Sequence, residues 1–285
     1  MKRIALMCDS SADISVEEAR ELEIHVVRMS LLIDDQSYVE AQDISQEEIL
    51  NILRAGKTIK TTQPAIGIVT MAWDELLKTY DEVFYLPISK GLSGTCENAI
   101  AASQEYDGKV TVVDSTIACY PVILMLKRAR ELFAEGYSCA QVKELFEAQG
   151  ELYAILIPEN LTTLKNGGRI SPAAAALAGL LKIHPLLTIE DGKIDVYDKV
   201  RTLSKAYKEG IAAVMKDVNV DDYDWMIIDA DNRKASDELK VQMEEALGVT
   251  VMQATFKAVI LSHVGPGTVA FGRIRKIKPD IAPAN

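Results

Sequence analysis

The segment 83-VFYLPISKGLSGTCENAIAASQEY-106 joins an apolar run to a glycine-rich loop and then to a helical pattern. The run 83–89 is apolar almost throughout, which is typical of a strand buried on both faces of a parallel sheet. A helix is predicted over 95–106, directly after the loop that holds Gly91, Ser93 and Gly94. A strand that passes through a loop into a helix is the repeating unit of α/β folds, so this segment predicts a parallel sheet.

The same alternation continues on both sides of that segment. The pairs Ser15/Glu18 and Ser45/Glu48 have the spacing of capping boxes, which mark helix starts. Strands are predicted over 3–8, 24–33, 83–89 and 110–114, and helices over 16–23, 46–56, 68–80, 95–106 and 116–136. Because each apolar strand is followed by a helix, we expect helices on both faces of one Rossmann-like sheet.

The second half of the chain has a different pattern, in which hairpin and alternating elements are mixed. A β-hairpin is predicted over 183–200, with Asp191-Gly192 at its turn. The other predicted elements are strands over 152–158, 225–229, 251–256 and 259–272, helices over 202–218 and 235–247, and an alanine-rich helix over 173–182. This mixture predicts an α+β domain.

These patterns together predict a two-domain α/β fold. The N-terminal parallel-sheet domain is expected over 1–155 and the C-terminal α+β domain over 156–285, with the segment 60–80 a candidate for packing with the second domain. A groove between two domains is the usual place for a small ligand. The alanine-rich helix and the segments rich in Ile, Val and Met are candidates for an apolar wall of such a groove.

The composition excludes several functional classes. The chain of 285 residues has a net charge of −11, so it lacks the basic surface that nucleic acid requires. The four cysteines form no C-x-x-C pair and none has zinc-ligand spacing with a histidine, so no metal site is predicted. The longest apolar runs fall short of the ~20 residues that cross a bilayer. We therefore expect a cytoplasmic protein with reduced thiols and no transmembrane segment.

The loop 88-ISKGLSGT-95 is compatible with three different functions. A phosphate cradle would need G-x-x-x-x-G-K-[ST] or G-x-G-x-x-G, and neither string occurs in the chain. A nucleophile elbow has the pattern G-x-S-x-G, and here Thr95 replaces the last glycine. Under that interpretation the protein is a serine hydrolase of lipid-like esters. Ser93 would be its nucleophile, and His263, at the end of an apolar strand, would be its base.

The third interpretation is an anion site that forms no bond to its ligand. Ser93 and the amide of Gly94 lie at a predicted helix N-terminus, where free N–H groups and the helix dipole favour an anion. Thr61 and Thr62 offer further hydroxyls. Arg169 follows two glycines, and a guanidinium can bind a carboxylate or phosphate through two parallel hydrogen bonds.

Six short motifs, in this order along nearly the whole chain, carry a resemblance to a known family. They are DSSADI at 9–14, TTQPA at 61–65, SKGLSGT at 89–95, VVDS at 112–115, LKNGGRIS at 164–171 and HVGPGT at 263–268. This ordered set resembles the DegV family of bacterial fatty-acid-binding proteins. The resemblance implies a two-domain α/β fold that holds a long-chain fatty acid, such as palmitate, stearate or oleate, between the domains.

The resemblance also implies roles for particular residues. The groups that it implies for binding the fatty-acid carboxylate are Thr62, Ser93 and Gly94. The groups that it implies beside the carboxylate, in support of phosphoryl transfer, are Thr61, Arg169 and His263. In the family's kinase system a separate ATP-dependent subunit phosphorylates the bound acid, so the chain itself is expected to be a carrier with no catalytic residue, cofactor or metal.

Four positions depart from the family's pattern. Thr62 stands where serine is usual and keeps a hydroxyl, whereas Ala65 loses one. Lys90 stands where a serine is common, and His184 where a lysine is common. None of these departures removes an expected ligand group, but Ala65 and Lys90 bear on the detailed hydrogen bonding at the site.

Overall fold

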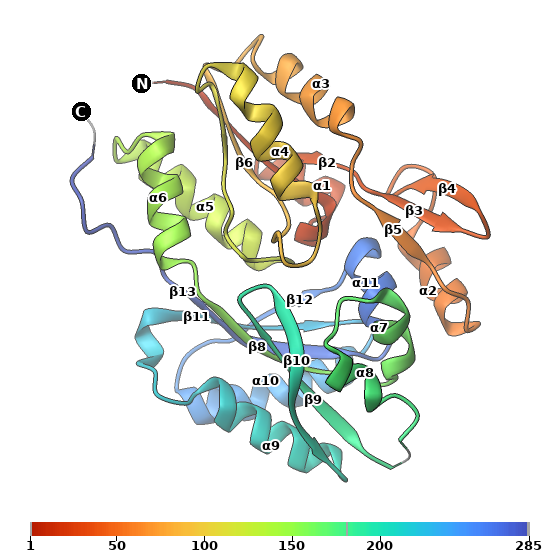
Figure 1. Cartoon of the computed structure of the whole chain (residues 1–285). Coiled ribbons are helices and arrows are strands. Elements are labelled where there is room, and N and C mark those ends of the chain that lie inside the picture. Colours follow the sequence, from red (N-terminus) through yellow and green to blue (C-terminus); the bar gives the residue numbers. More distant parts are fainter. Residues whose placement is uncertain (1, 181, 284–285) are drawn as a thin grey trace.

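The computed structural model describes residues 2–180 and 182–283, which form three β-sheets with helices around them (Figure 1). A four-stranded sheet is built from the first part of the chain and a six-stranded sheet from the second. A small three-stranded sheet lies to one side.

The four-stranded sheet is parallel throughout and has the strand order β2-β1-β6-β7. Its strands are β1 (Ile4–Asp9), β2 (Ile24–Val27), β6 (Glu82–Leu86) and β7 (Val110–Val112). Helices α1 (Val16–Glu21), α5 (Pro121–Ala134) and α6 (Cys139–Gln149) cover one face, and α3 (Ile66–Leu76) and α4 (Thr95–Ser103) cover the other. Alternate residues of β1 and β6 enter the two cores, which confirms the predicted parallel sheet with helices on both faces.

The strand order reverses between β1 and β6, because β1 leads to β2 on one side and β6 leads to β7 on the other. Loops at the carboxyl ends of two such strands diverge and leave a crevice, which is the usual ligand site of open α/β sheets. The buried carboxylate of Asp9 joins the two strand ends, since Oδ1 accepts the amide of Ser11 and Oδ2 accepts the amide of Ile88, both at 2.9 Å. The loop that carries Ser93 therefore begins at this reversal point.

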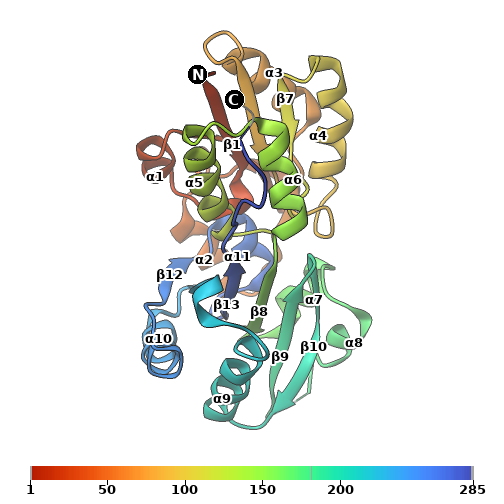
Figure 2. The ribbon, with the colours of Figure 1, turned by 90° about the vertical axis from the view of Figure 1, so that its left-hand side faces the viewer.

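The six-stranded sheet has the order β10-β9-β8-β13-β11-β12, with only β11 and β12 parallel among its described pairs. Its strands are β8 (Leu152–Ile157), β9 (His184–Glu190), β10 (Lys193–Val200), β11 (Tyr223–Asp229), β12 (Met252–Thr255) and β13 (Val269–Arg275). Helices α9 (Leu203–Val214) and α10 (Arg233–Leu247) pack on its outer face, whereas α7 (Leu161–Gly167) and α11 (Ala258–Val264) lie toward the first sheet (Figure 2). The predicted hairpin is confirmed, with Asp191 and Gly192 both at positive φ in its turn.

The three-stranded antiparallel sheet consists of β3 (Ser30–Ile33), β4 (Gln36–Val39) and β5 (Lys60–Thr62), and α2 (Gln46–Arg54) packs with it. Leu31 of this sheet and Ile49 of α2 share one hydrophobic cluster with Leu156 and Leu261 of the second half. Of the segment 60–80, β5 lies against α11, whereas Val69 and Trp73 of α3 pack on the four-stranded sheet. The described residues also form three short 3₁₀ helices, which span Ser10–Ala12, Gln104–Tyr106 and Val220–Asp222.

Two strand predictions are wrong, and both concern apolar runs whose partners are distant. The expected strand 24–33 is split into β2 and β3, which belong to different sheets, and Arg28 forms an ion pair with Glu40 at the break. The expected strand 259–272 is helix α11 followed by a turn and β13. Short apolar runs do not distinguish a buried strand from a buried helix. Here the run forms α11, a helix that is buried on nearly all sides.

Several helix boundaries also differ from the predictions. The helix expected over 116–136 begins only at Pro121, because Thr116 and Cys119 have positive φ. The alanine-rich helix expected over 173–182 is limited to α8 (Pro172–Ala176), and its predicted extension includes residue 181, which lies outside the described residues. Helices α6 and α7 form in segments for which no helix was predicted, each after a polar N-cap, Ser138 and Asn160.

We predict that Gly272→Ala destabilises the protein by about 1–3 kcal/mol or more. A Cβ atom at this position of β13 would overlap the backbone of Tyr153 and Ala154 in the neighbouring strand, which cannot move aside easily. Gly67→Ala on α3 is the matched control, since its Cβ meets no atom within 4 Å and alanine favours helix. Urea unfolding of both variants checks this, and equal midpoints would contradict the close strand packing.

Candidate ligand-binding site

A cavity lies between the inner face of the six-stranded sheet, helix α11 and the loops at the carboxyl edge of the four-stranded sheet. It is partly open to solvent, and its cavity volume is about 120 Å³. Its wall is mainly apolar, and its polar lining side chains include Thr61, Thr62, Ser93, Arg169 and His263. A concave, mostly apolar site with a few convergent polar groups is typical of a small-molecule binding site.

The floor of the cavity is a trough along the paired strands β8 and β13. Ala154 pairs with Gly272 and Leu156 with Ala270, so three small residues lie together in the middle of the sheet. Ile189 flanks Ala154 on one side, and Met226 flanks Gly272 on the other. Small residues between larger ones leave room for an extended apolar ligand, and all of these residues line the cavity.

The polar residues come from four separate segments that meet at the cavity. Thr61 Oγ1 of β5 lies 2.7 Å from Nε2 of His263 at the end of α11. Arg169 Nε, after α7, donates to the carbonyl oxygen of Leu92 at 3.5 Å. A Cβ atom on Gly94 would lie 3.0 Å from Oε1 of Gln63, so the loops 61–65 and 88–95 lie side by side. The structure thus places five of the six predicted site residues on the cavity wall, whereas Gly94 follows Ser93 and does not line the cavity itself.

Ser93 lies just before α4, whose N-cap is Gly94. Its Oγ is 2.9 Å from Oγ1 of Thr95 and accepts the amide of Thr95 at 3.3 Å. The described residues contain no hydrogen bond between Ser93 and His263, and Nε2 of His263 is already occupied by Thr61. The arrangement therefore lacks the nucleophile–base pair of a hydrolase but presents a hydroxyl and a helix N-terminus to a ligand.

The side chain of His263 is half-buried. Burial lowers the pKa of its imidazole to about 4, and the positive charge of Arg169 contributes further in the same direction. Nδ1 is buried without a hydrogen-bond partner among the described residues, and a Cβ atom on Gly167 would lie 2.7 Å from it. The absence of a side chain at Gly167 is what allows α7 to pack against this ring.

Arg169 reaches the site because α7 ends in a left-handed turn. Gly168 has a φ of 68°, a conformation that glycine adopts without steric cost, and the chain reverses there. The guanidinium donates back to the carbonyl oxygen of Gly167 at 2.5 Å, while the side chain remains exposed. Arg169 therefore stands at the cavity mouth with donors available to an approaching anion.

The apolar wall was predicted only in part, because segments rich in Ile, Val and Met do line the cavity but the alanine-rich helix does not. The described residues of 173–182 do not line the cavity, and the wall comes instead from β8, β13, β11 and α11. Gln63, Leu92 and Thr116 also line the cavity and were not singled out as ligand groups.

Two further classes of site are absent from the described part of the chain. No group of three or more His, Cys, Asp or Glu side chains there is placed to hold a metal ion. Likewise, no helix within residues 2–180 and 182–283 has the length and apolar character needed to cross a membrane.

Comparison with known proteins gives the same family as the motifs. The model of the DegV family, described as "Uncharacterised protein, DegV family", matches residues 3–276. A DegV domain-containing protein of Staphylococcus aureus strain N315 is 31% identical over 281 residues, which cover 97% of this chain and 100% of that protein.

Solved structures of similar proteins have the same fold. A DegV family protein of Thermus thermophilus, described as binding fatty acid, superposes with a TM-score of 0.84 at 30% identity, covering 96% of this chain and 100% of that chain. A fatty-acid-binding DegV family protein of Streptococcus agalactiae superposes with a TM-score of 0.85 at 28% identity, covering 97% and 100%. These likenesses confirm the predicted α/β fold and the expected family.

We predict that the imidazole of His263 titrates near pH 4 in the folded protein, well below its usual pKa of about 6.5. Between pH 6.5 and 4 the histidine is protonated in the unfolded chain but not in the folded one. The free energy of unfolding therefore decreases as the pH falls through this range. NMR titration of the Cε1–H resonances measures the pKa, with His263→Gln to assign the signal. A value at or above 6.5 would contradict the half-buried, neutral ring.

Proposed function

The chain belongs to the DegV family, and from that premise we propose that it is a carrier that binds one long-chain fatty acid in the cavity described above. Palmitate, stearate and oleate are the candidate ligands. The observation that carries the proposal is that one cavity combines an apolar trough with a cluster of hydroxyl, imidazole and guanidinium groups. The description of two structural relatives as fatty-acid-binding supports it.

In this proposal the hydroxyls of Thr62 and Ser93 and the amide of Gly94 bind the carboxylate. Burying a carboxylate costs several kcal/mol unless its oxygens are hydrogen-bonded. Ser93 and Thr62 line the cavity, and Gly94 is the N-cap of α4, at a helix N-terminus where amides favour an anion. The nearby guanidinium of Arg169 adds a positive charge at the same mouth.

The acyl chain then extends along the trough of β8 and β13. Each buried CH₂ group contributes about 0.8 kcal/mol of transfer free energy, so a chain of sixteen carbons gains most of its affinity there. Ala154, Ala270 and Gly272 provide the space, and Met226 and Ile228 bound it on one side. The acyl chain has no polar groups along its length, so an apolar wall leaves none of its atoms without a hydrogen-bond partner.

The proposed fate of the bound acid is phosphorylation by a partner ATP-dependent kinase. A carboxylate oxygen would attack the γ-phosphorus of ATP, and the bond to ADP would break, giving an acyl phosphate. Arg169 is exposed at the mouth and His263 lies beside it, so both are in position to assist when the partner docks. The chain itself would catalyse no step, and it would act in the cytoplasm, where ATP is available.

We also propose a division into two domains around this cavity, with the boundary just before β8, a few residues ahead of the expected position 155/156, so that all of β8 belongs to the second domain. Each part has its own central sheet and its own core on the faces away from the cavity. The C-terminal tail returns to the first part, where Gln149 and Lys278 exchange two hydrogen bonds and Ile281 accepts one from Tyr137. Relative movement of the two parts would open the cavity for loading.

We predict that the wild-type protein binds a fluorescent fatty acid that palmitate displaces, and that Ser93→Ala raises the Kd of palmitate about tenfold or more. A hydrogen bond to a charged group contributes about 1.5–3 kcal/mol, and Ser93 would donate one to the carboxylate. Ser103→Ala is the matched control, because Ser103 caps a carbonyl at the other end of α4. Unchanged affinity of Ser93→Ala would exclude Ser93 as a ligand.

The same proteins distinguish a carrier from a serine hydrolase. A carrier should not react with a fluorophosphonate probe and should not turn over p-nitrophenyl esters. Labelling at Ser93, or ester turnover abolished by Ser93→Ala, would establish the hydrolase in its place.

We predict that Arg169→Ala lowers the rate of acyl phosphate formation with a purified fatty acid kinase by about tenfold or more, with an unchanged melting temperature. The expected loss corresponds to one charge-assisted hydrogen bond near the transferred phosphoryl group. Arg169 is exposed, so its removal should not affect folding. Arg20→Ala on α1, another exposed arginine, serves as control. Normal phosphorylation by Arg169→Ala would exclude Arg169 from the transfer.

A further inference from the structure

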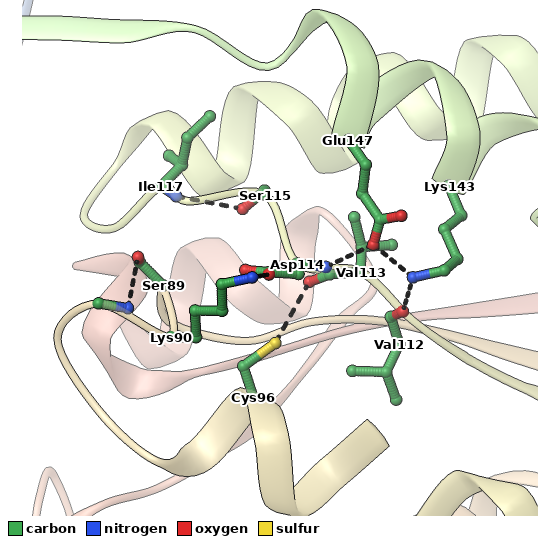
Figure 3. Close-up of polar contacts among 11 residues, drawn as sticks. Ser89, Lys90, Cys96, Val112, Val113, Asp114, Ser115, Ile117, Lys143 and Glu147 are labelled. Atoms are coloured by element: carbon green, nitrogen blue, oxygen red, sulfur yellow. Dashed lines mark hydrogen bonds and ion pairs between the residues drawn. The ribbon is translucent and has the colours of Figure 1, made fainter. Parts of the chain in front are cut away.

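Lys90 lies on the loop that carries Ser93, at a position where the family resemblance led us to expect serine. Its Nζ is 2.5 Å from Oδ2 of Asp114, which follows β7 on the neighbouring side of the sheet (Figure 3). The side chain of Lys90 is 55% exposed and that of Asp114 only 14%. The ion pair therefore connects a surface loop to a largely buried carboxylate.

The loop around Lys90 is a tight turn organised by Ser89. The carbonyl oxygen of Ser89 accepts the amides of Leu92 and Ser93 at 3.0 and 3.2 Å. The amide of Ser89 donates to the carbonyl oxygen of Ile117 at 2.9 Å, and its Oγ accepts the amide of Gly91 at 3.2 Å. Lys90 is the next residue in this turn. A change in the position of its side chain would therefore move the backbone that also holds Ser93.

Asp114 is held from the opposite side, so it offers Lys90 a fixed partner. Its amide donates to Oε1 of Glu147 on α6 at 2.9 Å. Glu147 forms an ion pair with Lys143, whose Nζ donates to the carbonyl oxygen of Val112 at 2.8 Å (Figure 3). These contacts fix the end of β7 to α6 independently of the loop.

The carboxylate of Asp114 depends on Lys90 for its charge balance. Its Oδ1 is buried and has no hydrogen-bond partner among the described residues, and Oδ2 faces Lys90. A shielded carboxylate that loses its cation is left uncompensated, which is more costly than the loss of an exposed ion pair. The ion pair therefore stabilises the loop conformation in which Lys90 contacts Asp114.

The hairpin turn of the six-stranded sheet closes on the same loop. A Cβ atom on Gly91 would lie 2.6 Å from the carbonyl oxygen of Gly192, so the two turns pack backbone to backbone. The loop 89–93 therefore lies between the hairpin turn and the Lys90–Asp114 pair, and Gly192 also lines the cavity. A shift of the loop would change the direction of Ser93 at the mouth.

We infer that the Lys90–Asp114 ion pair is a positioning element, which holds the turn 89–93 so that Ser93 and the N-terminus of α4 face the ligand's carboxylate. The inference rests on the proposed fatty-acid function of the same cavity. Because the pair acts on the head-group loop and not on the trough, it should govern affinity for the carboxylate and leave affinity for the acyl chain unchanged.

The test compares two ligands of equal chain length, palmitate and 1-hexadecanol, by displacement of one fluorescent probe. We expect Lys90→Met to raise the Kd of palmitate about three- to tenfold and to change that of 1-hexadecanol less than about twofold. Lys90→Arg should retain palmitate affinity. The double variant Lys90→Met/Asp114→Asn should bind palmitate no more weakly than Lys90→Met alone, because the two residues act as a pair. Lys78→Met, which removes an exposed ion pair with Glu75, is the control.

Three results would overturn the inference: unchanged palmitate affinity in Lys90→Met, equal loss for acid and alcohol, or an equal loss in Lys78→Met. Equal loss for both ligands would mean that the pair only stabilises the fold. Lys90 is exposed, so Lys90→Met remains informative even if Asp114→Asn fails to fold. A wild-type protein that binds neither palmitate nor the alcohol would contradict the fatty-acid function itself, which is a separate outcome.

Discussion

The buried carboxylate of Asp9 is the constraint on which the geometry of the site depends. It lies at the end of β1 and accepts the amide of Ile88 at the end of β6, so it ties together the two strands between which the sheet order reverses. It is 1% exposed; burial raises its pKa, and the hydrogen bonds from Ser11 and Ile88 counteract that rise. From this fixed point the turn 89–93 begins, and Ser93 and the N-terminus of α4 follow within a few residues.

The site also requires that polar groups and an apolar trough border the same cavity. Both must do so while the hydrophobic cores of the two large sheets stay buried. The head-group side is assembled from β5, the loop after β6, the end of α7 and the end of α11, joined by the Thr61–His263 contact and by Arg169 on Leu92. The trough is the inner face of a sheet whose outer face is covered by α9 and α10. A ligand with one charged end and a long apolar body matches this division, whereas a uniformly polar ligand would bury polar groups in the trough without hydrogen-bond partners.

Local signals predicted those parts of the structure that local interactions determine. The strand–loop–helix unit at 83–106, the helix start at Ser15, the capping box at Ser45 and the Asp191-Gly192 turn depend on neighbours in the sequence, and all are present. At Ser15 only half of the predicted capping box forms, because the Glu18 side chain accepts a hydrogen bond from Tyr120 instead. The motifs also identified residues that meet at one cavity, although their roles in binding are proposals. The strand predicted over 259–272 and the wall assigned to 173–182 were wrong, because each depends on contacts that are distant in sequence. The trough needs Ala154 beside Gly272, a strand register that no local pattern specifies.

The central claim is that a fatty acid lies in the cavity with its carboxylate at the four-segment mouth and its chain in the trough. A crystal structure of the protein with bound palmitate tests this most directly. We expect a carboxylate oxygen about 2.6–3.0 Å from Oγ of Ser93 and from Oγ1 of Thr62. The acyl carbons should lie over Ala154, Ala270 and Gly272. Palmitate bound in the reverse direction, with its methyl end at Ser93, or bound outside this cavity, would contradict the account.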